Sequence, residues 1–511
     1  MWHNETNWRR QMCLHRLLTM SLVMWTYSQA VLADQVTLKS TSSPIELVGE
    51  LKSFDNEVYV IETDLGVLEV DARTVTCSGS ACPSIINLAS EFTILGNQTV
   101  INNLLVPLLE SYSYSLDADI ETAIETTTRS SIKITANDGQ EFARISVRPQ
   151  AEPDLPSTLK ITSGTPGDLS KNTNNANKLP IAADALVAVT SGINPVKSIS
   201  LNTLHSVLSG SIKNWKEIGG PDAKINVYLP KKSSDLSKVA NELGFDFSNA
   251  IHAERFEDLE TLSKTAASDP YGLGFTSFAN RRTAKALPIL ESCGAFMRPN
   301  AFNISSGNYP TTFYYYLEAM PETLPIFARE FLDYIGDAQA KSMIDRQGYP
   351  SLSIHENSLD NQGNRIVHAL LNDASLAKNP DFNSMLLTLN GARQLSTVLR
   401  FGETGVRLNP QSSVVLKALI SELLLGNYAD QTLIITGFAD SKRSAAESKR
   451  ISKSSATIVS NLIKNADSDA LFSDLRVEVI GYGSASPIAC EDTPEGVNAN
   501  NRVEIWVKDS L

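Results

Sequence analysis

The hydrophobic pattern near the start of the chain has a period of two. Between residues 38 and 76, apolar and polar positions alternate, for example over 57–63. Turn-forming residues at 55–56 and 64–66 separate the alternating runs. Such alternation is typical of half-buried β-strands joined by tight turns. We therefore predict a small β module over residues 34–88.

From residue 91 onward, short apolar runs alternate with helical patterns. The run 92–95 precedes helical spacing over 100–114, and a second strand-like run occupies 185–189. This alternation favours a mostly parallel α/β sheet. The stretch 165–178 is rich in Gly, Asn and Lys and predicts a surface loop. We assign residues 89–355 to this α/β domain.

The pattern changes again in the last third of the chain. Residues 356–392 contain apolar positions at helical spacing around Ile366 and Leu370, and we interpret them as a linker with a helix. Beyond them, strand and helix patterns follow one another in the order β-α-β-α-β-β. They predict a compact α+β domain over residues 393–511, with strands at 396–401, 432–435, 476–480 and 502–507 and helices at 412–425 and 445–463.

The first 33 residues have the pattern of a secretory signal peptide. Arg9, Arg10 and Arg16 precede an apolar run that continues to Ala33. A retained membrane anchor is the alternative, but the run contains several polar residues and is shorter than the ~20 residues that a span needs. We expect export, removal of residues 1–33, and no membrane span in the remaining chain.

Length and charge narrow the function classes. A chain of 511 residues is too long for one core and predicts several domains. Its formal charge is −13, and residues 1–33 carry three arginines and one glutamate, so the charge without them is −15. Nucleic acid and anionic lipid need a basic surface, so neither is expected as a partner.

The cysteines and histidines bear on the compartment and the chemistry. Cys77 and Cys82 flank a flexible turn, and in an oxidising compartment a local disulfide is expected. Cys293 and Cys490 can be free or can pair across domains. Among the histidines after residue 33, none stands at metal-ligand spacing or in a hydrolase motif. We expect no enzyme activity, no metal and no cofactor.

Three C-terminal segments, 435–440, 481–487 and 493–505, resemble the OmpA-like peptidoglycan-binding family. The resemblance implies a pocket for the diaminopimelate of the cell-wall stem peptide. In that pocket an aspartate faces the ammonium group and an arginine faces the carboxylate, through charge-assisted hydrogen bonds. Peptidoglycan is therefore an expected partner.

The family residues carry over only in part. Asp440 matches the family aspartate, although the preceding residues are Phe438 and Ala439. The family's Asn-Arg-Arg reads Asn500-Asn501-Arg502 in this chain, which keeps one arginine, and Asn501 and Arg502 are the further candidate peptidoglycan-binding residues. Ser455 stands where the clamping arginine is expected, and serine has no guanidinium group to hold a carboxylate. The alternative for Asp440 is a helix N-cap or loop residue in a domain that has lost the ligand.

Residues 91–355 resemble the PstS-like phosphate-binding periplasmic proteins. The resemblance implies a two-lobed binding protein with a ligand cleft between the lobes. The segments that carry it are 92–99, 181–188, 194–196, 208–222 and 269–275.

The expected anion site begins at the loop from Gly96 to Thr99. Glycine allows close approach of the backbone, Thr99 offers a hydroxyl, and a helix N-terminus follows, although an ordinary capped helix start has the same pattern. Near residue 230 the family has Ser-Gly-Thr-Arg, whereas this chain has two serines after Lys231 and Lys232, without the arginine. The candidate ligand residues are Gly96, Asn97, Gln98, Thr99, Ser163, Ser233 and Ser234.

These resemblances imply a multidomain, non-enzymatic protein of the periplasm or the outer-membrane-associated envelope. It would combine a small β module, an α/β two-lobed domain like the periplasmic binding proteins, and an α+β OmpA-like domain. Its expected function is binding of a solute, phosphate or another small anion, coupled to peptidoglycan association. The alternative is a structural or protein-interaction scaffold of the envelope whose domains have lost their ligands.

Overall fold

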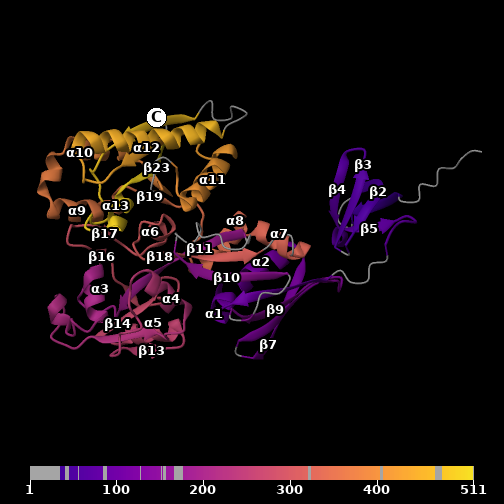
Figure 1. Ribbon diagram of the computed structural model, residues 1–511, viewed down its shortest axis with the longest axis horizontal. Coiled ribbons are helices and arrows are strands. Elements are labelled where there is room, and N and C mark those ends of the chain that lie inside the picture. Colours follow the sequence, from indigo (N-terminus) through magenta and orange to yellow (C-terminus); the bar gives the residue numbers. More distant parts are fainter. Residues whose placement is uncertain are drawn as a thin grey trace, which may run out of the picture. The chain divides into compact units, whose positions relative to one another are not determined.

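The computed structural model in Figure 1 forms two compact units, Met1–Ile86 and Asn87–Leu511. The proposed signal peptide and most of the predicted loop 165–178 lie outside the described residues. The structure describes residues 35–40, 45–55, 57–83, 89–126, 128–150, 152, 157–165, 177–319, 324–402, 407–466 and 475–509.

The first unit contains one antiparallel sheet with the strand order β4-β3-β2-β1-β5. Val36 and Leu38 on one strand and Tyr59 and Ile61 on another are buried at alternate positions, so the predicted period of two is confirmed. Cys77 and Cys82 form the predicted disulfide. The strands are β1 (Gln35–Ser40), β2 (Glu46–Phe54), β3 (Val58–Thr63), β4 (Gly66–Asp71) and β5 (Val75–Ser78).

The second unit contains a large sheet with the order β13-β12-β14-β11-β18-β10-β6-β9-β8-β7, with β15 beside β11. Its strands are β6 (Ser90–Gly96), β7 (Ala118–Thr126), β8 (Arg129–Ala136), β9 (Glu141–Pro149), β10 (Thr158–Gly164), β11 (Asn177–Thr190), β12 (Asn226–Pro230), β13 (Glu254–Phe256), β14 (Gly272–Ser277), β15 (Lys285–Ala286) and β18 (Thr312–Ala319).

The expectation of a mostly parallel sheet is wrong, because the sheet is mixed. β6 pairs in parallel with β9 and β10, and β12 with β13 and β14. β7, β8 and β9 pair antiparallel, and β11 and β18 are antiparallel to each other. Short connections let consecutive strands run in opposite directions without a crossover helix. The turn between β8 and β9 is an example, in which Gly139 has a positive φ of 90°.

Helices pack against this sheet. The predicted helix over 100–114 is confirmed as a continuous helical segment of α1 (Gln98–Val100), a π-helical turn (Ile101–Leu105) and α2 (Val106–Ser115). Leu104, Leu105, Leu108 and Leu109 are fully buried along one face of it. The remaining helices are α3 (Leu201–Leu208), α4 (Asp235–Glu242), α5 (Leu259–Ser268), α6 (Ala301–Ser305), α7 (Ile326–Tyr334) and α8 (Ala338–Arg346).

Two lobes share the long strand β11. Its first part pairs with β18, as far as Ala185, and its last part pairs with β14 from Leu186 onward. One lobe therefore holds β6 to β10, and the other holds β12 to β14 with α4 and α5 (Figure 1). This is the two-lobed architecture that the sequence predicted.

The C-terminal part of the second unit has its own sheet, in the order β19-β20-β23-β21-β22. Its hydrophobic core lies between this sheet and α11 and α12, so the predicted order of strands and helices is confirmed, with α13 added before the last strand. The elements are β19 (Glu356–Ser358), β20 (Arg393–Arg400), α11 (Pro410–Leu424), β21 (Gln431–Phe438), α12 (Ala445–Asn465), β22 (Arg476–Gly481), α13 (Pro494–Asn500) and β23 (Arg502–Asp509).

Residues 356–392 differ from the predicted linker. They supply the edge strand β19, then α9 (Gly363–Asn372) and α10 (Pro380–Leu389). Phe382, Met385 and Leu389 of α10 are buried in one cluster with Trp506 of β23. Their spacing puts all three on one helix face, so α10 packs on the C-terminal sheet as part of its fold.

The C-terminal sheet is joined to the two-lobed domain by covalent and polar contacts. Cys293 and Cys490, whose pairing the sequence left open, form a disulfide. Arg400 Nη2 of β20 donates to Asn308 Oδ1 at 2.7 Å, and the rings of Phe296 and His368 stack with centroids 4.6 Å apart. Burial lowers the pKa of Arg400 to about 10. The two domains are therefore packed against each other rather than merely tethered.

Within the part of the chain that the structure describes, no helix combines the length and the apolar character needed to cross a bilayer.

We predict that replacing Cys293 and Cys490 together by serine lowers the thermal unfolding midpoint of the protein. The disulfide closes a long loop, with a sequence separation of 197, so loop-closure entropy alone predicts a loss of about 5 kcal/mol. Differential scanning calorimetry under oxidising conditions measures the shift. A midpoint equal to that of the parent protein would contradict this contribution.

Candidate functional site

Residues from both lobes line a cavity of about 60 Å³. This volume exceeds the ~10–15 Å³ that one water molecule requires, so the cavity has room for a small polyatomic solute. The lining residues are Asn97, Thr99, Val100, Ser163, Ser234, Asp235, Leu236, Glu257, Asp258, Leu259, Asn280, Phe313, Tyr315 and Tyr349. We call this cavity the cleft.

Three helix N-termini meet at the cleft. Asn97, Ser234 and Asp258 are the N-caps of α1, α4 and α5, and all three line it. Their side chains accept hydrogen bonds from their own helices, for example Ser234 Oγ from Ser237 N at 3.1 Å and Asp258 Oδ2 from Thr261 N at 2.7 Å. The first N–H groups of each helix have no intrahelical acceptor, and each N-terminus carries a partial positive charge.

Carboxylates also line the cleft, while no lysine or arginine is among its described lining residues. Asp235 Oδ1 lies 3.0 Å from Lys238 Nζ, and Glu257 forms an ion pair with Lys231. Burial acts to raise the pKa of Asp258, but hydrogen bonds from Thr261 outweigh it and the pKa is lowered. The cleft therefore combines positive helix ends with acidic side chains that can accept hydrogen bonds.

Asp184 lies at the point where β11 changes its pairing partner. The residue is fully buried, and its Oδ1 accepts hydrogen bonds from Ala185 N at 2.8 Å and Ala279 N at 3.2 Å. Burial raises the pKa of Asp184 to about 6, although the two N–H groups act in the opposite direction. Tyr315 and Tyr349 both line the cleft. Their pKa values are raised mainly by burial, and to a smaller extent by the nearby Asp184 carboxylate.

The structure brings four of the seven predicted ligand residues together. Asn97, Thr99, Ser163 and Ser234 line the cleft. Gly96, Gln98 and Ser233 are not among the lining residues.

The structure shows what surrounds the other three residues, Gly96, Gln98 and Ser233. A Cβ atom at Gly96 would lie 2.3 Å from the Ile161 side chain, so glycine is required there for packing. Gln98 Nε2 donates to Asn102 Oδ1 at 2.9 Å, and the Ser233 side chain is exposed. The roles of all seven residues in ligand binding stay predictions.

Sequence reasoning did not find the acidic and aromatic lining of the cleft. Asp235 and Asp258 stand at helix starts, a position that also suits simple capping. Asp184 does not line the cleft, but the sequence marks it, since it is the one acidic residue in the apolar run 181–189. An acidic residue inside a buried strand is rare unless it has a specific environment.

In the C-terminal domain, Asp440 follows β21 and its side chain is only 2% exposed. Its Oδ2 accepts hydrogen bonds from Asn501 Nδ2 at 2.9 Å and Arg443 Nη1 at 2.8 Å. Burial acts to raise the pKa of Asp440, but the bonds from Asn501, Lys442 N and Arg443 outweigh it and lower the pKa. The N-cap of α12 is Ser444, so Asp440 is a loop residue with an ionised carboxylate.

Arg502 and Ser455 differ in their surroundings. Arg502 is completely buried, and its Nη2 lies 2.7 Å from Glu504 Oε1 and 3.0 Å from Ser486 O. Its guanidinium also stacks over Phe438, 4.3 Å from the ring centroid. Every polar contact that the structure gives to this guanidinium is internal. Ser455 is half-buried on α12.

Comparison with known proteins covers mainly the two-lobed domain. Residues 89–338 match a family model for a PBP superfamily domain. The chain is 31% identical over 169 residues to the phosphate-binding protein PstS of Bacillus subtilis (strain 168), a match that covers 32% of this chain and 55% of that protein. The chain thus spans about half the length of this curated relative. The match is to a solute-binding and non-enzymatic family, in agreement with the expected absence of enzyme activity.

Two solved structures are also similar to parts of this chain. The ABC-type phosphate transport receptor from Vibrio cholerae has a TM-score of 0.38 and 19% identity, over 50% of this chain and 98% of that chain. The peptidoglycan-associated lipoprotein from Burkholderia pseudomallei has a TM-score of 0.19 and 15% identity, over 22% of this chain and 89% of that chain.

We predict that the protein loses stability as the pH rises, because the buried Asp184 ionises, and that Asp184→Asn removes this loss. In the folded protein the pKa of Asp184 is about 6, above the ordinary value of 3.8. The contribution of Asp184 to the free energy of unfolding is therefore fully present below about pH 4 and is lost as the pH rises through 6. The full loss is about 3 kcal/mol. Asparagine keeps the acceptor oxygen but does not ionise.

Thermal unfolding of the parent protein and the Asp184→Asn variant between pH 4.5 and 8 measures this effect. The variant should gain stability relative to the parent as the pH rises. A difference between the two proteins that does not change with pH would contradict the assignment.

Proposed function

We propose that residues 89–355 bind phosphate in the cleft. The observation that carries the proposal is the meeting of Asn97, Thr99, Ser163 and Ser234 in one cavity at the start of three helices. Helix N-termini attract anions through unpaired N–H groups and partial positive charge. The curated relative named above is a phosphate-binding protein.

The carboxylates of the cleft favour a protonated oxyanion over a fully ionised one. Phosphate near neutral pH carries a P–OH group, which can donate a hydrogen bond to a carboxylate such as Asp235 or Glu257. Sulfate has no proton to donate and would place its full charge against these carboxylates. The same arrangement thus accounts for acidic side chains in an anion site and predicts that phosphate binds in preference to sulfate.

Isothermal titration calorimetry of the purified protein tests this proposal. Phosphate should bind, sulfate should bind more weakly, and Thr99→Ala or Ser163→Ala should each weaken phosphate binding about tenfold or more, the effect of losing a hydrogen bond to a charged group. Ser209→Ala, at an exposed serine that does not line the cleft, is the control. Equal phosphate affinity in all these variants would exclude the cleft as the phosphate site.

We further propose that the C-terminal domain binds peptidoglycan through Asp440. The proposal rests on the OmpA-like motifs and on the ionised, buried carboxylate that Asn501 orients. Arg443 occupies the position at Asp440 that a ligand ammonium would take. The Arg443 side chain is 45% exposed, and its pair with Asp440 is its only ion pair among the described residues, so a ligand can displace it at low cost.

Sedimentation with purified peptidoglycan tests this second proposal. Asp440→Ala should reduce the bound fraction, while Arg443→Ala should increase it by removing the competing cation. Ser455→Arg should also increase binding by adding a partner for the ligand carboxylate. Arg450→Ala, an exposed arginine of the same helix, is the control. Retention that is identical for Asp440→Ala and the parent would remove Asp440 from the mechanism.

Both proposals place the protein in the cell envelope, by way of the predicted signal peptide at residues 1–33. The disulfides Cys77–Cys82 and Cys293–Cys490 fit an oxidising compartment. The alternative function is an envelope scaffold without ligands. A lack of heat with phosphate and with neutral and cationic solutes, together with no retention on peptidoglycan, would favour the scaffold.

A further inference from the structure

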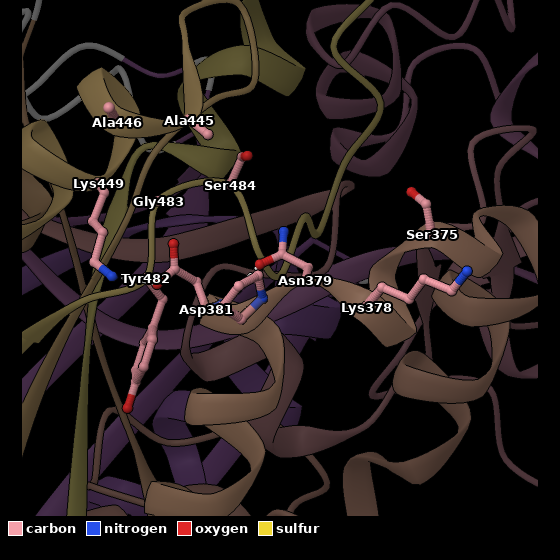
Figure 2. A pocket seen from close by; sticks show the side chains of 11 residues that line it. Ser375, Lys378, Asn379, Asp381, Ala445, Ala446, Lys449, Tyr482, Gly483 and Ser484 are labelled. Atoms are coloured by element: carbon pink, nitrogen blue, oxygen red, sulfur yellow. Dashed lines mark hydrogen bonds and ion pairs between the residues drawn. The ribbon is translucent and has the colours of Figure 1, made fainter.

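A second and larger cavity lies in the C-terminal domain. Its volume is about 400 Å³, within the range of ~300–1,000 Å³ typical of small-molecule pockets. It opens between the start of α10, the start of α12 and the loop after β22 (Figure 2). We call it the α10–α12 pocket; its lining residues are Ser375, Lys378, Asn379, Pro380, Asp381, Ala445, Ala446, Lys449, Tyr482, Gly483 and Ser484.

Two helix N-termini contribute to this pocket. Asn379 caps α10, and Ala445 and Ala446 are the first two residues of the 21-residue helix α12. The Ser444 side chain, which caps α12, accepts from Glu447 N at 3.3 Å. The N–H groups of Ala445 and Ala446 precede that bond and have no intrahelical acceptor. Both helices therefore add partial positive charge to the pocket.

Two lysines add full positive charges. Lys449 Nζ lies 2.5 Å from Asp381 Oδ1, and the side chains are 57% and 23% exposed. Lys378 is exposed and forms no ion pair with any residue that the structure describes. In Figure 2, Lys449 extends from α12 toward Asp381, while Lys378 and Ser375 form another part of the wall. Asp381 thus faces the Lys449 ammonium group, while the Lys378 ammonium group lies in another part of the pocket (Figure 2).

The charge balance of this pocket is the reverse of that in the cleft. The cleft lining contains Asp235, Glu257 and Asp258 and no basic side chain among its described residues. The α10–α12 pocket contains Lys378 and Lys449 and only Asp381 as an acid. In a chain with a formal charge of −13, a pocket with an excess of positive charge indicates a site for an anion.

We propose that the α10–α12 pocket binds a small molecule through a phosphate or carboxylate group. Lys378 and Lys449 supply the charge, the first N–H groups of α12 supply backbone donors, and the Ser484 hydroxyl adds a side-chain donor. The Lys449–Asp381 pair is partly exposed, so an incoming anion can take the place of Asp381 at Lys449. Asp440 does not line this pocket, so the site is separate from the proposed peptidoglycan contact and does not depend on it.

Titration calorimetry of the full chain with inorganic phosphate and with citrate tests the proposal, one probe for each type of anionic group. The parent for these titrations carries Thr99→Ala and Ser163→Ala, so that binding in the cleft is weakened. At least one probe should still bind. Lys378→Ala with Lys449→Ala should weaken that binding about tenfold or more, and Asp381→Asn should strengthen it by removing the competing carboxylate.

Lys464→Ala, in the last turn of α12, is the matched control and should bind as the parent does. If the double lysine variant is unstable, Lys378→Ala alone serves, since this exposed side chain contributes nothing to the core. Failure of both probes to bind, or equal binding in the lysine variants and the parent, would overturn the proposal. Neither result bears on Asp440 or on the cleft, which have their own variants.

Discussion

The strand β11 is the element on which the arrangement of the two lobes depends. It pairs with β18 up to Ala185 and with β14 from Leu186, so both lobes are hydrogen-bonded to one continuous strand. Asp184 lies at the change of partner and binds N–H groups of Ala185 and Ala279, the latter following β14. Because the strand fixes the lobes at this point, the starts of α1, α4 and α5 meet at one cavity.

Direct contacts also join the C-terminal sheet to the two-lobed domain. The disulfide between Cys293 and Cys490 and the bond from Arg400 to Asn308 connect the two covalently and electrostatically. On the C-terminal side, Arg502 and Glu504 form a completely buried ion pair, which fixes the start of β23 beside Asp440. A buried charge pair of this kind tolerates the loss of neither partner. We infer that movement between the two domains is restricted.

Much of the fold could be predicted from the hydrophobic period, and the parts that could not have identifiable reasons. The helix of residues 445–463 and the strands around it follow from spacing alone. The apolar spacing around Ile366 and Leu370 predicts only a helix within a linker. The cluster of Phe382, Met385 and Leu389 with Trp506 could not be predicted, because Trp506 is distant in sequence. At the cleft, Asn97, Thr99, Ser163 and Ser234 could be found from local motifs. Tyr315 on β18, Glu257 after β13 and Tyr349 after α8 come from distant parts of the chain, and only the tertiary fold brings them to the same cavity. The hydrogen bond from Arg443 to Asp440 likewise depends on side-chain geometry that no motif contains.

The central claim, that a solute binds where three helices begin, is tested most directly by hydrogen–deuterium exchange with and without inorganic phosphate. Bound phosphate should slow exchange of the amides that open α1, α4 and α5, in peptides that cover Asn97, Ser234 and Asp258. Protection should occur at all three helix starts together, because they line one cavity. Unchanged exchange at these three starts under saturating phosphate would contradict the account.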